Sequence, residues 1–206
     1  YSLYFAGGGS VVVQEEDNEF DNLSSITIEV FTKLTTNPGN GNHTRLVGGA
    51  SISVEGTSET NPVIEFNIAG DCGGSHAIHT NSVELNEWVH VAALYDNEEG
   101  IIKIFLNGIA SPETFPCTLN SFNLGTLSFG YGADTPTSLK GFISEIRIWD
   151  RALSESEIQE NMNNLEMVES EGLIGNWKFN AGTGDIAYDY SGNHNHGEII
   201  GATWAG

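Results

Sequence analysis

The apolar residues of this chain fall into short runs that are separated by Gly, Asn, Asp and Pro. Several runs are rich in β-branched and aromatic residues, which favour strands, and the residues between the runs favour turns. Short strands at regular spacing are typical of a β-sandwich or a β-barrel. We therefore predict an all-β fold with strands at residues 10–14, 26–34, 45–54, 62–68, 88–95, 101–106, 124–130, 142–149 and 172–179.

Two of these strands predict how the sheets are covered. Along residues 26–34 apolar and polar positions alternate, which places Ile26, Ile28 and Val30 on one face. Residues 88–95 (WVHVAALY) are apolar on both faces. Such a strand is expected in the middle of a sheet that is covered on both sides.

One short helix is predicted after the strand at residues 142–149. Ser154 and Glu157 have the spacing of a capping box, in which Ser154 is the N-cap residue. Leu153 and Ile158 occupy the two positions of a hydrophobic staple. We expect this helix to end at about Asn163.

The length of 206 residues and the 39% of hydrophobic residues suit one large β-sandwich. No apolar run approaches the roughly 20 residues that a membrane-spanning helix needs, so we expect no membrane insertion. No internal repeat or low-complexity linker divides the chain, and we expect residues 1–206 to form a single domain. Residue 1 is Tyr and no signal peptide is visible, so we expect a module excised from a longer, processed protein.

The charge balance excludes one class of partner. The chain has 28 acidic and 7 basic residues, a formal net charge of −21. Nucleic acid binding needs clustered Lys and Arg, and anionic membrane surfaces are disfavoured for the same reason. The acidity has two explanations: it keeps the protein soluble, or some carboxylates converge on a divalent cation such as Ca²⁺.

Two cysteines, Cys72 and Cys117, bear on the cellular compartment in which the protein works. They are too few for a thiolate zinc site, and they do not form the C-x-x-C pattern of a redox pair. We expect a structural disulfide, which would stabilise the fold by roughly 4 kcal/mol and place the protein outside a reducing cytosol. The alternative is two buried free thiols.

Six segments along nearly the whole chain form one recognisable pattern through their order and spacing. They are residues 1–13 (YSLYFAGGGSVVV), 88–92 (WVHVA), 103–108 (KIFLNG), 141–157 (GFISEIRIWDRALSESE), 177–184 (WKFNAGTG) and 189–197 (DYSGNHNHG). Taken together, these segments resemble the laminin-G-like, concanavalin A-like jelly roll of secreted and surface proteins. The resemblance implies a two-sheet antiparallel jelly-roll sandwich with one short helix, in an extracellular protein.

Several large or polar side chains fall in apolar strand contexts. We expect Trp88, Trp149 and Trp177 to lie in the core rather than to act as ligand platforms. His90 is expected to be a hydrogen-bonded core histidine rather than a catalyst.

Arg147 lies between two isoleucines on an alternating strand, so we predict that it is buried. A buried arginine needs a carboxylate partner. Glu145 is two residues away on the same face and is the nearest candidate.

The motifs of the enzymes that share this jelly roll are missing. Glycoside hydrolases of the fold carry Glu-x-Asp-x-x-Glu on one strand, whereas Glu19 and Asp21 are followed by Ser24. No Gly-x-Ser-x-Gly segment occurs, and seven basic residues can hardly build the basic cleft of a polysaccharide lyase. His76 and His79 share no helix with a third ligand, which argues against zinc there. We expect no enzymatic activity.

The C-terminal segment is the strongest candidate for a metal site. Asp189, Ser191, Asn193 and Asn195 alternate through a Gly-rich turn. The resemblance implies a Ca²⁺ ion near this turn, bound by Asp189, the backbone around Asn193 and the carbonyl of Gly7.

The chain departs from the family pattern at two positions of that site. Ala6 and Ser144 stand where the family usually has Asp, which removes two carboxylates. The alternative is that Asp189 and Asn193 only hold the turn through bonds to the backbone.

The leading functional hypothesis is a glycan-binding module, from an adhesin or beside a polysaccharide-degrading enzyme. Its expected ligand residues lie on two loops, Asp71 and His76 on one and Tyr131 and Asp134 on the other. The second hypothesis is a protein-binding or spacer module of a surface protein, because fold alone does not choose between sugar and protein ligands. An enzyme with an unrecognised site is the third.

Overall fold

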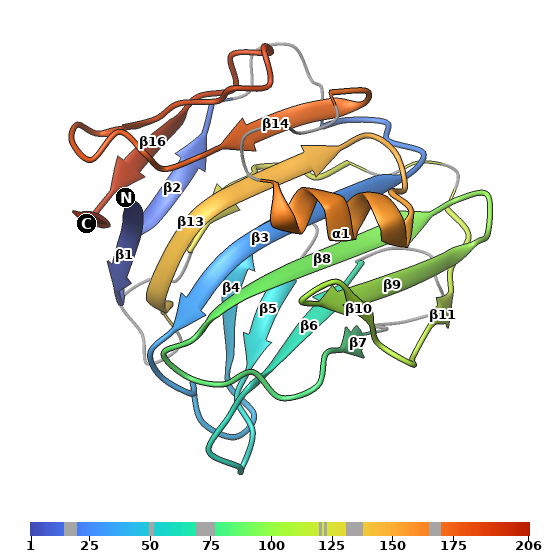
Figure 1. The fold of residues 1–206 in the computed structure, drawn as a ribbon, viewed down its shortest axis with the longest axis horizontal. Coiled ribbons are helices and arrows are strands. Elements are labelled where there is room, and N and C mark those ends of the chain that lie inside the picture. The colour runs from blue at the N-terminus through green and yellow to red at the C-terminus, as the bar shows by residue number, and fades with distance from the viewer. Residues whose placement is uncertain are drawn as a thin grey trace.

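The fold is a sandwich of two antiparallel sheets (Figure 1). The computed structural model describes residues 1–14, 20–49, 52–68, 77–119, 121, 123–130, 138–164 and 170–206. The predicted all-β, two-sheet sandwich with one short helix is confirmed over these residues.

A nine-stranded sheet has the order β10-β9-β8-β3-β13-β1-β17, with β11 paired to β9 and β14 paired to β13. The chain ends lie side by side because β1 and β17 are neighbours (Figure 1). The strands of this sheet are β1 (Ser2–Ala6), β3 (Ile26–Leu34), β8 (Trp88–Asp96), β9 (Ile101–Leu106), β10 (Ile109–Ala110), β11 (Phe115–Pro116), β13 (Lys140–Trp149), β14 (Leu173–Trp177) and β17 (Thr203–Ala205).

An eight-stranded sheet packs against the nine-stranded one and has the order β15-β16-β2-β12-β4-β5-β6-β7. Its strands are β2 (Ser10–Val13), β4 (His43–Val47), β5 (Ile52–Glu55), β6 (Val63–Asn67), β7 (Ala77–His79), β12 (Ser128–Phe129), β15 (Ile186–Ala187) and β16 (Gly197–Ile200).

The main core lies between the two sheets. Ile26, Ile28 and Val30 point into it from β3 and are fully buried, as their alternation predicts. Trp177 lies in the same core, with its ring edge-on to Phe129 at a centroid distance of 4.8 Å. The burial of these side chains holds the two sheets together, because each Å² of apolar surface removed from water contributes about 25 cal/mol to the free energy of folding.

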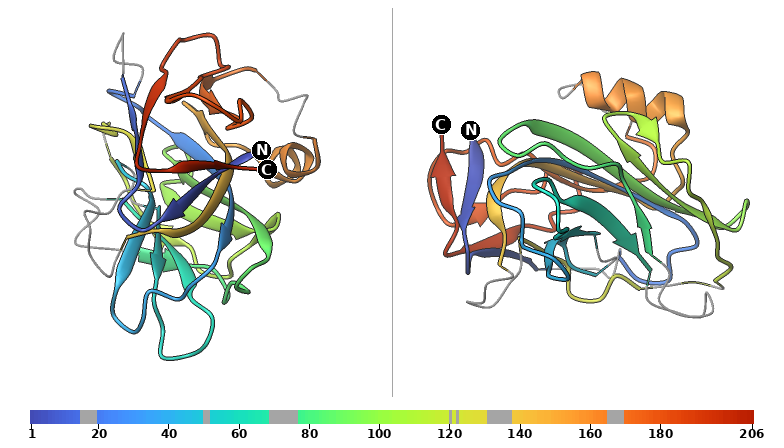
Figure 2. Two further views of the ribbon diagram at one scale, coloured as in Figure 1. Left: turned by 90° about the vertical axis from the view of Figure 1, so that its left-hand side faces the viewer. Right: turned by 90° about the horizontal axis from the view of Figure 1, so that it is seen from below.

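A second, smaller core covers part of the outer face of the nine-stranded sheet. Helix α1 (Glu155–Asn163) lies across this face, away from the eight-stranded sheet (Figure 2). Ile158 of the helix packs with Leu94, Phe105 and Trp149 of the sheet. This confirms that β8 is central and that its part around Ala92 and Leu94 is covered on both sides. In the described part of the chain, no helix has the length and apolar character needed to cross a bilayer.

The prediction that residues 45–54 form one strand is wrong. β4 and β5 are two strands of a hairpin, with Thr44 opposite Val54. Gly49, in the turn that joins them, has a φ of +92°, a backbone conformation that residues other than glycine rarely adopt. The strand expected at residues 124–130 is also shorter than predicted, since only Ser128–Phe129 pair as β12.

The tryptophans divide between core and surface. Trp149 and Trp177 are fully buried, as expected, but Trp88 is 45% exposed, and its assignment to the core is wrong. Trp88 is the first residue of β8, on the same outer face as Leu94. The helix packs on Leu94 and does not cover the Trp88 end of the strand.

The predicted capping box begins helix α1. Ser154 Oγ accepts a hydrogen bond from the Glu157 backbone N–H at 3.3 Å, and Glu157 Oε2 accepts one from the Ser154 N–H at 2.7 Å. Arg151 also lies 2.7 Å from the Glu157 carboxylate. The hydrogen bond from Arg151, with those from Ser154, lowers the pKa of Glu157 from 4.5 to about 2.

We expect Glu157→Gln to lower the free energy of unfolding by about 1 kcal/mol at neutral pH, because the ion pair is partly exposed and screened by solvent. A carboxylate with a depressed pKa stabilises the fold above its unfolded pKa. The difference between wild type and variant should therefore be full above pH 4.5 and disappear as the pH falls towards 2. Urea unfolding across this pH range measures it. Glu160→Gln, an exposed change on the same helix, should show no such pH dependence.

Candidate functional site

The four predicted ligand residues, Asp71, His76, Tyr131 and Asp134, lie outside the described residues, and they stay predictions. Cys72 also lies outside them, so its pairing with Cys117, which is buried in the main core, stays a prediction as well.

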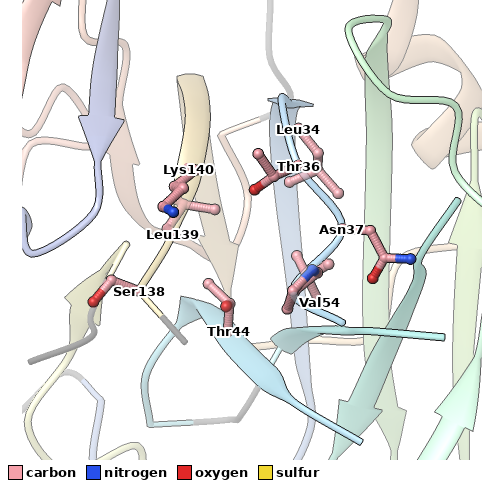
Figure 3. A pocket seen from close by; sticks show the side chains of 9 residues that line it. Leu34, Thr36, Asn37, Thr44, Val54, Ser138, Leu139 and Lys140 are labelled. Atoms are coloured by element: carbon pink, nitrogen blue, oxygen red, sulfur yellow. The ribbon is translucent and has the colours of Figure 1, made fainter. Parts of the chain in front are cut away.

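A small pocket is lined by residues of β3 and β13 of one sheet and of β4 and β5 of the other (Figure 3). Its volume is about 210 Å³. Leu34, Val54 and Leu139 form apolar walls, and Thr36 and Ser138 add hydroxyl groups. The volume of the pocket is below the roughly 300 Å³ at which small-molecule sites usually begin, so the pocket suits one small group of a ligand.

A row of side chains on the outer face of the nine-stranded sheet offers a larger surface. Tyr4, Phe142, Lys33 and Trp88 are successive cross-strand partners on β1, β13, β3 and β8. We call these four residues the aromatic row. Each is at least partly exposed, and Trp88 is the most exposed of them. The row therefore crosses four strands on a face that α1 leaves open.

Contacts within the aromatic row fix its shape. The rings of Tyr4 and Phe142 have centroids 4.8 Å apart, and those of Trp88 and Phe142 are 6.3 Å apart. Lys33 Nζ lies 4.5 Å from the Phe142 centroid and 5.2 Å from the Trp88 centroid. These ring contacts and cation–π interactions stabilise the arrangement. The result is a surface with aromatic faces and one ammonium donor.

A buried charged cluster separates the aromatic row from the helix-covered core. Arg147 Nε donates to Glu145 Oε1 at 2.8 Å, as predicted, and Arg147 Nη1 lies 3.4 Å from Glu29 Oε2. Arg147 also donates to the backbone carbonyl of Asn161 on α1. Both carboxylates are at most 5% exposed. They are therefore closed to a substrate, and Arg147 links them to each other and to α1.

The prediction for His90 is correct in burial but not in hydrogen bonding. The ring is buried and lies tilted against the Phe31 ring, with a centroid distance of 4.6 Å. Neither ring nitrogen has a hydrogen-bond partner, and Nε2 lies 3.5 Å from Glu29 Oε1, which also has none.

The burial of the Glu145 carboxyl raises its pKa, although the Arg147 guanidinium acts in the opposite direction.

We expect Arg147→Met to lower the free energy of unfolding by about 3–5 kcal/mol, because Glu29 and Glu145 would remain buried without their cation. The loss should be smaller at acid pH, where protonated carboxyls cost less to bury. Chemical denaturation at several pH values tests both statements. The same change at the partly exposed Arg151 should cost about 1 kcal/mol or less. An equal loss for both arginines would contradict this role of Arg147.

The C-terminal turn is organised around the buried carboxylate of Asp189. Asp189 Oδ1 accepts from the N–H groups of Asn176 and Ser191, and Oδ2 accepts from Ser191 Oγ and the Asn195 N–H, at 2.7–3.1 Å. Asn193 donates its side-chain amide to the Ile174 carbonyl at 3.1 Å. These bonds are those of a carboxylate that holds a turn.

The third predicted calcium ligand, Gly7, lies in the turn between β1 and β2. The Lys140 side chain lies beside Gly7, since a Cβ added to Gly7 would lie 3.5 Å from Lys140 Cε. A cation at Asp189 would have to displace N–H donors, because all four acceptor positions of that carboxylate are in use. The calcium site at Asp189, Asn193 and Gly7 remains a prediction.

We expect Asp189→Ala to lower the free energy of unfolding by about 2–3 kcal/mol without added calcium, because buried N–H groups lose their acceptor. If Ca²⁺ binds here, it should raise the melting temperature of the wild type and leave that of the variant unchanged. Thermal unfolding with Ca²⁺ and with EDTA measures both effects. The exposed Asp185→Asn serves as control. A calcium response that persists in Asp189→Ala would rule out this site.

Comparison with known proteins places the chain in one family. The family model described as the concanavalin A-like lectin/glucanases superfamily (Laminin_G_3) matches residues 5–159. No protein with a curated function matches the sequence.

Three solved structures illustrate the similarity. A candidate carbohydrate-binding protein from Bacteroides ovatus is 22% identical, with a TM-score of 0.76 over 98% of this chain. The chain spans 58% of that protein's length. A SAP-like pentraxin from Limulus polyphemus is 15% identical, with a TM-score of 0.62 over 81% of this chain and 84% of its own. The binding domain of botulinum neurotoxin DC, in complex with SialylT, is 20% identical, with a TM-score of 0.59 over 80% of this chain and 42% of its own. At these identities the similarity shows the fold alone.

Proposed function

Because the chain belongs to the concanavalin A-like lectin/glucanases superfamily, we propose that it is a non-catalytic glycan-binding module. We further propose that the aromatic row is the surface that contacts the glycan. The observation that carries this proposal is Trp88, a large aromatic side chain that is 45% exposed and aligned with Phe142 and Tyr4 across the sheet. The similarity to a candidate carbohydrate-binding protein is consistent with it.

The chemistry of the aromatic row suits an oligosaccharide. The C–H faces of sugar rings are apolar and pack on aromatic rings, while hydroxyl groups need polar partners such as the Lys33 ammonium. The row spans three strand spacings of roughly 4.8 Å each, or roughly 14 Å from β1 to β8. An open surface of this length favours a chain of several sugars over a single sugar.

The burial of Glu29 and Glu145, two acidic residues on the same face as the aromatic row, supports a binding role over a catalytic one. Glycoside hydrolysis needs two carboxyl groups that flank the scissile bond. Glu29 and Glu145 are the acidic residues of the neighbouring cluster, and both are buried behind Arg147 contacts. They support the sheet and are not available to a sugar.

We also propose that the module works outside the cell, as part of a secreted or surface protein. Its two cysteines support this location, and so does its membership of a family whose domains are often extracellular. The disulfide between Cys72 and Cys117 and the Ca²⁺ ion at the C-terminal turn belong to the same proposal.

We expect Trp88→Ala and Phe142→Ala to weaken glycan binding about tenfold or more, because central aromatic side chains dominate the binding energy of such surfaces. A glycan array with wild-type protein, with and without Ca²⁺, identifies a ligand, and titration calorimetry then gives the affinities. Tyr188→Ala is the matched control, because Tyr188 is 46% exposed but follows β15 of the other sheet.

Each other outcome identifies a different function or site. Equal affinities for wild type and Trp88→Ala would remove the aromatic row as the binding surface. An absence of binding to any glycan, together with binding to a surface protein, would favour a protein-binding module. Release of products from a polysaccharide would show an enzyme and overturn the proposal.

A further inference from the structure

Four side chains with metal-binding groups meet on the outer face of the eight-stranded sheet. They are His43 of β4, Glu55 of β5, Glu65 of β6 and His79 of β7. The strand register brings them together, because His43 is opposite Glu55 and Glu65 is opposite His79. We call these four residues the His/Glu cluster. It lies on the other sheet from the aromatic row and plays no part in the proposed glycan surface.

Three of the donor groups have a spacing close to that of ligands in a tetrahedral metal site. His79 Nε2 lies 3.0 Å from Glu55 Oε2 and 3.7 Å from Glu65 Oε2. His43 Nδ1 lies 3.4 Å from the same Glu65 oxygen. In a tetrahedron with bonds of about 2.0–2.1 Å to zinc, ligand atoms are about 3.3 Å apart. One ligand atom each from Glu55, Glu65 and His79 lie within 4.8 Å of one another.

We propose that the His/Glu cluster binds a divalent transition-metal ion of the Zn²⁺ type. His79, Glu55 and Glu65 are the three ligands whose atoms already converge, and His43, which contacts Glu65, would complete the site by turning its side chain towards them. Neutral imidazole and carboxylate are ordinary zinc ligands. Ca²⁺ prefers six to eight oxygen ligands, so the two imidazoles make this cluster unsuitable for it.

The charge of the His/Glu cluster favours a bound cation over simple ion pairs. With both imidazoles neutral, the two carboxylates give the cluster a formal charge of −2, in a chain of net charge −21. A divalent ion would neutralise the two carboxylates, one oxygen of each of which lies within 4.8 Å of the other. His43, Glu55 and His79 are partly exposed, so an ion can enter from solvent.

The competing explanation is that protonated histidines pair with the two glutamates without any metal. The two explanations differ in one measurable property, because only the first requires saturable metal binding. They also differ in ion selectivity, since ion pairs give no reason for Zn²⁺ to be preferred over Ca²⁺.

Titration calorimetry of tag-free protein with Zn²⁺ alone tests this proposal. We expect one equivalent to bind and to raise the melting temperature, and Ca²⁺ to have no such effect at this site. Co²⁺ in place of Zn²⁺ should give the visible absorption of a tetrahedral complex. His79→Gln and Glu65→Gln should each weaken binding about tenfold or more, since the loss of a ligand costs at least as much as the loss of its supporting partner.

The matched controls are His194→Gln and Glu198→Gln, two exposed residues of the C-terminal region. Both should bind Zn²⁺ as the wild type does. Melting curves in EDTA check that every variant is folded, and the partial exposure of His79 makes its replacement tolerable. Absence of Zn²⁺ binding to the wild type would overturn the proposal, as would undiminished binding in both cluster variants or loss of binding in His194→Gln. Each of these results leaves the glycan proposal standing, because the aromatic row is on the opposite sheet.

Discussion

Side chains alternate between the two faces of every strand, and in the nine-stranded sheet only one face can be buried by the other sheet. On β3 this alternation sends Ile28 and Val30 into the main core and leaves Glu29 and Phe31 on the outside. The outer face must then be covered, neutralised or used. Along the same strands, one part of this face is covered by a helix, one is neutralised by an arginine, and one is exposed to solvent.

The outer face of the nine-stranded sheet is divided into three zones along β3, β8 and β13. In the first zone, Ile158 of helix α1 packs with Trp149 of β13 and covers it. The second is neutralised by Arg147, which joins two buried carboxylates and the end of the helix. The third, the aromatic row, is left open to solvent. The core cluster that holds Ile158 of the helix contains no residue of this last zone.

The outer face of the eight-stranded sheet has a different chemistry. Its strands β4 to β7 carry imidazoles and carboxylates where the other sheet carries aromatic rings. The strong negative charge of the chain makes these acidic side chains costly to place together unless a cation or a protonated partner joins them. We therefore propose a different ligand for each face of the sandwich, a sugar chain on the nine-stranded sheet and a cation on the eight-stranded sheet.

The sequence by itself determined the features that depend on near neighbours in the chain. These include the alternation of β3, the two-sided character of β8, the capping box of α1 and the pairing of Arg147 with Glu145. Only the tertiary structure decided the rest. Alternation predicts which face a side chain occupies but not what covers that face, so Trp88 was assigned to the core although it lies beyond the reach of the helix. Likewise, the His/Glu cluster draws one residue from each of four strands, and the sequence pattern around His79 contains no sign of partners that only the strand register brings within bonding distance.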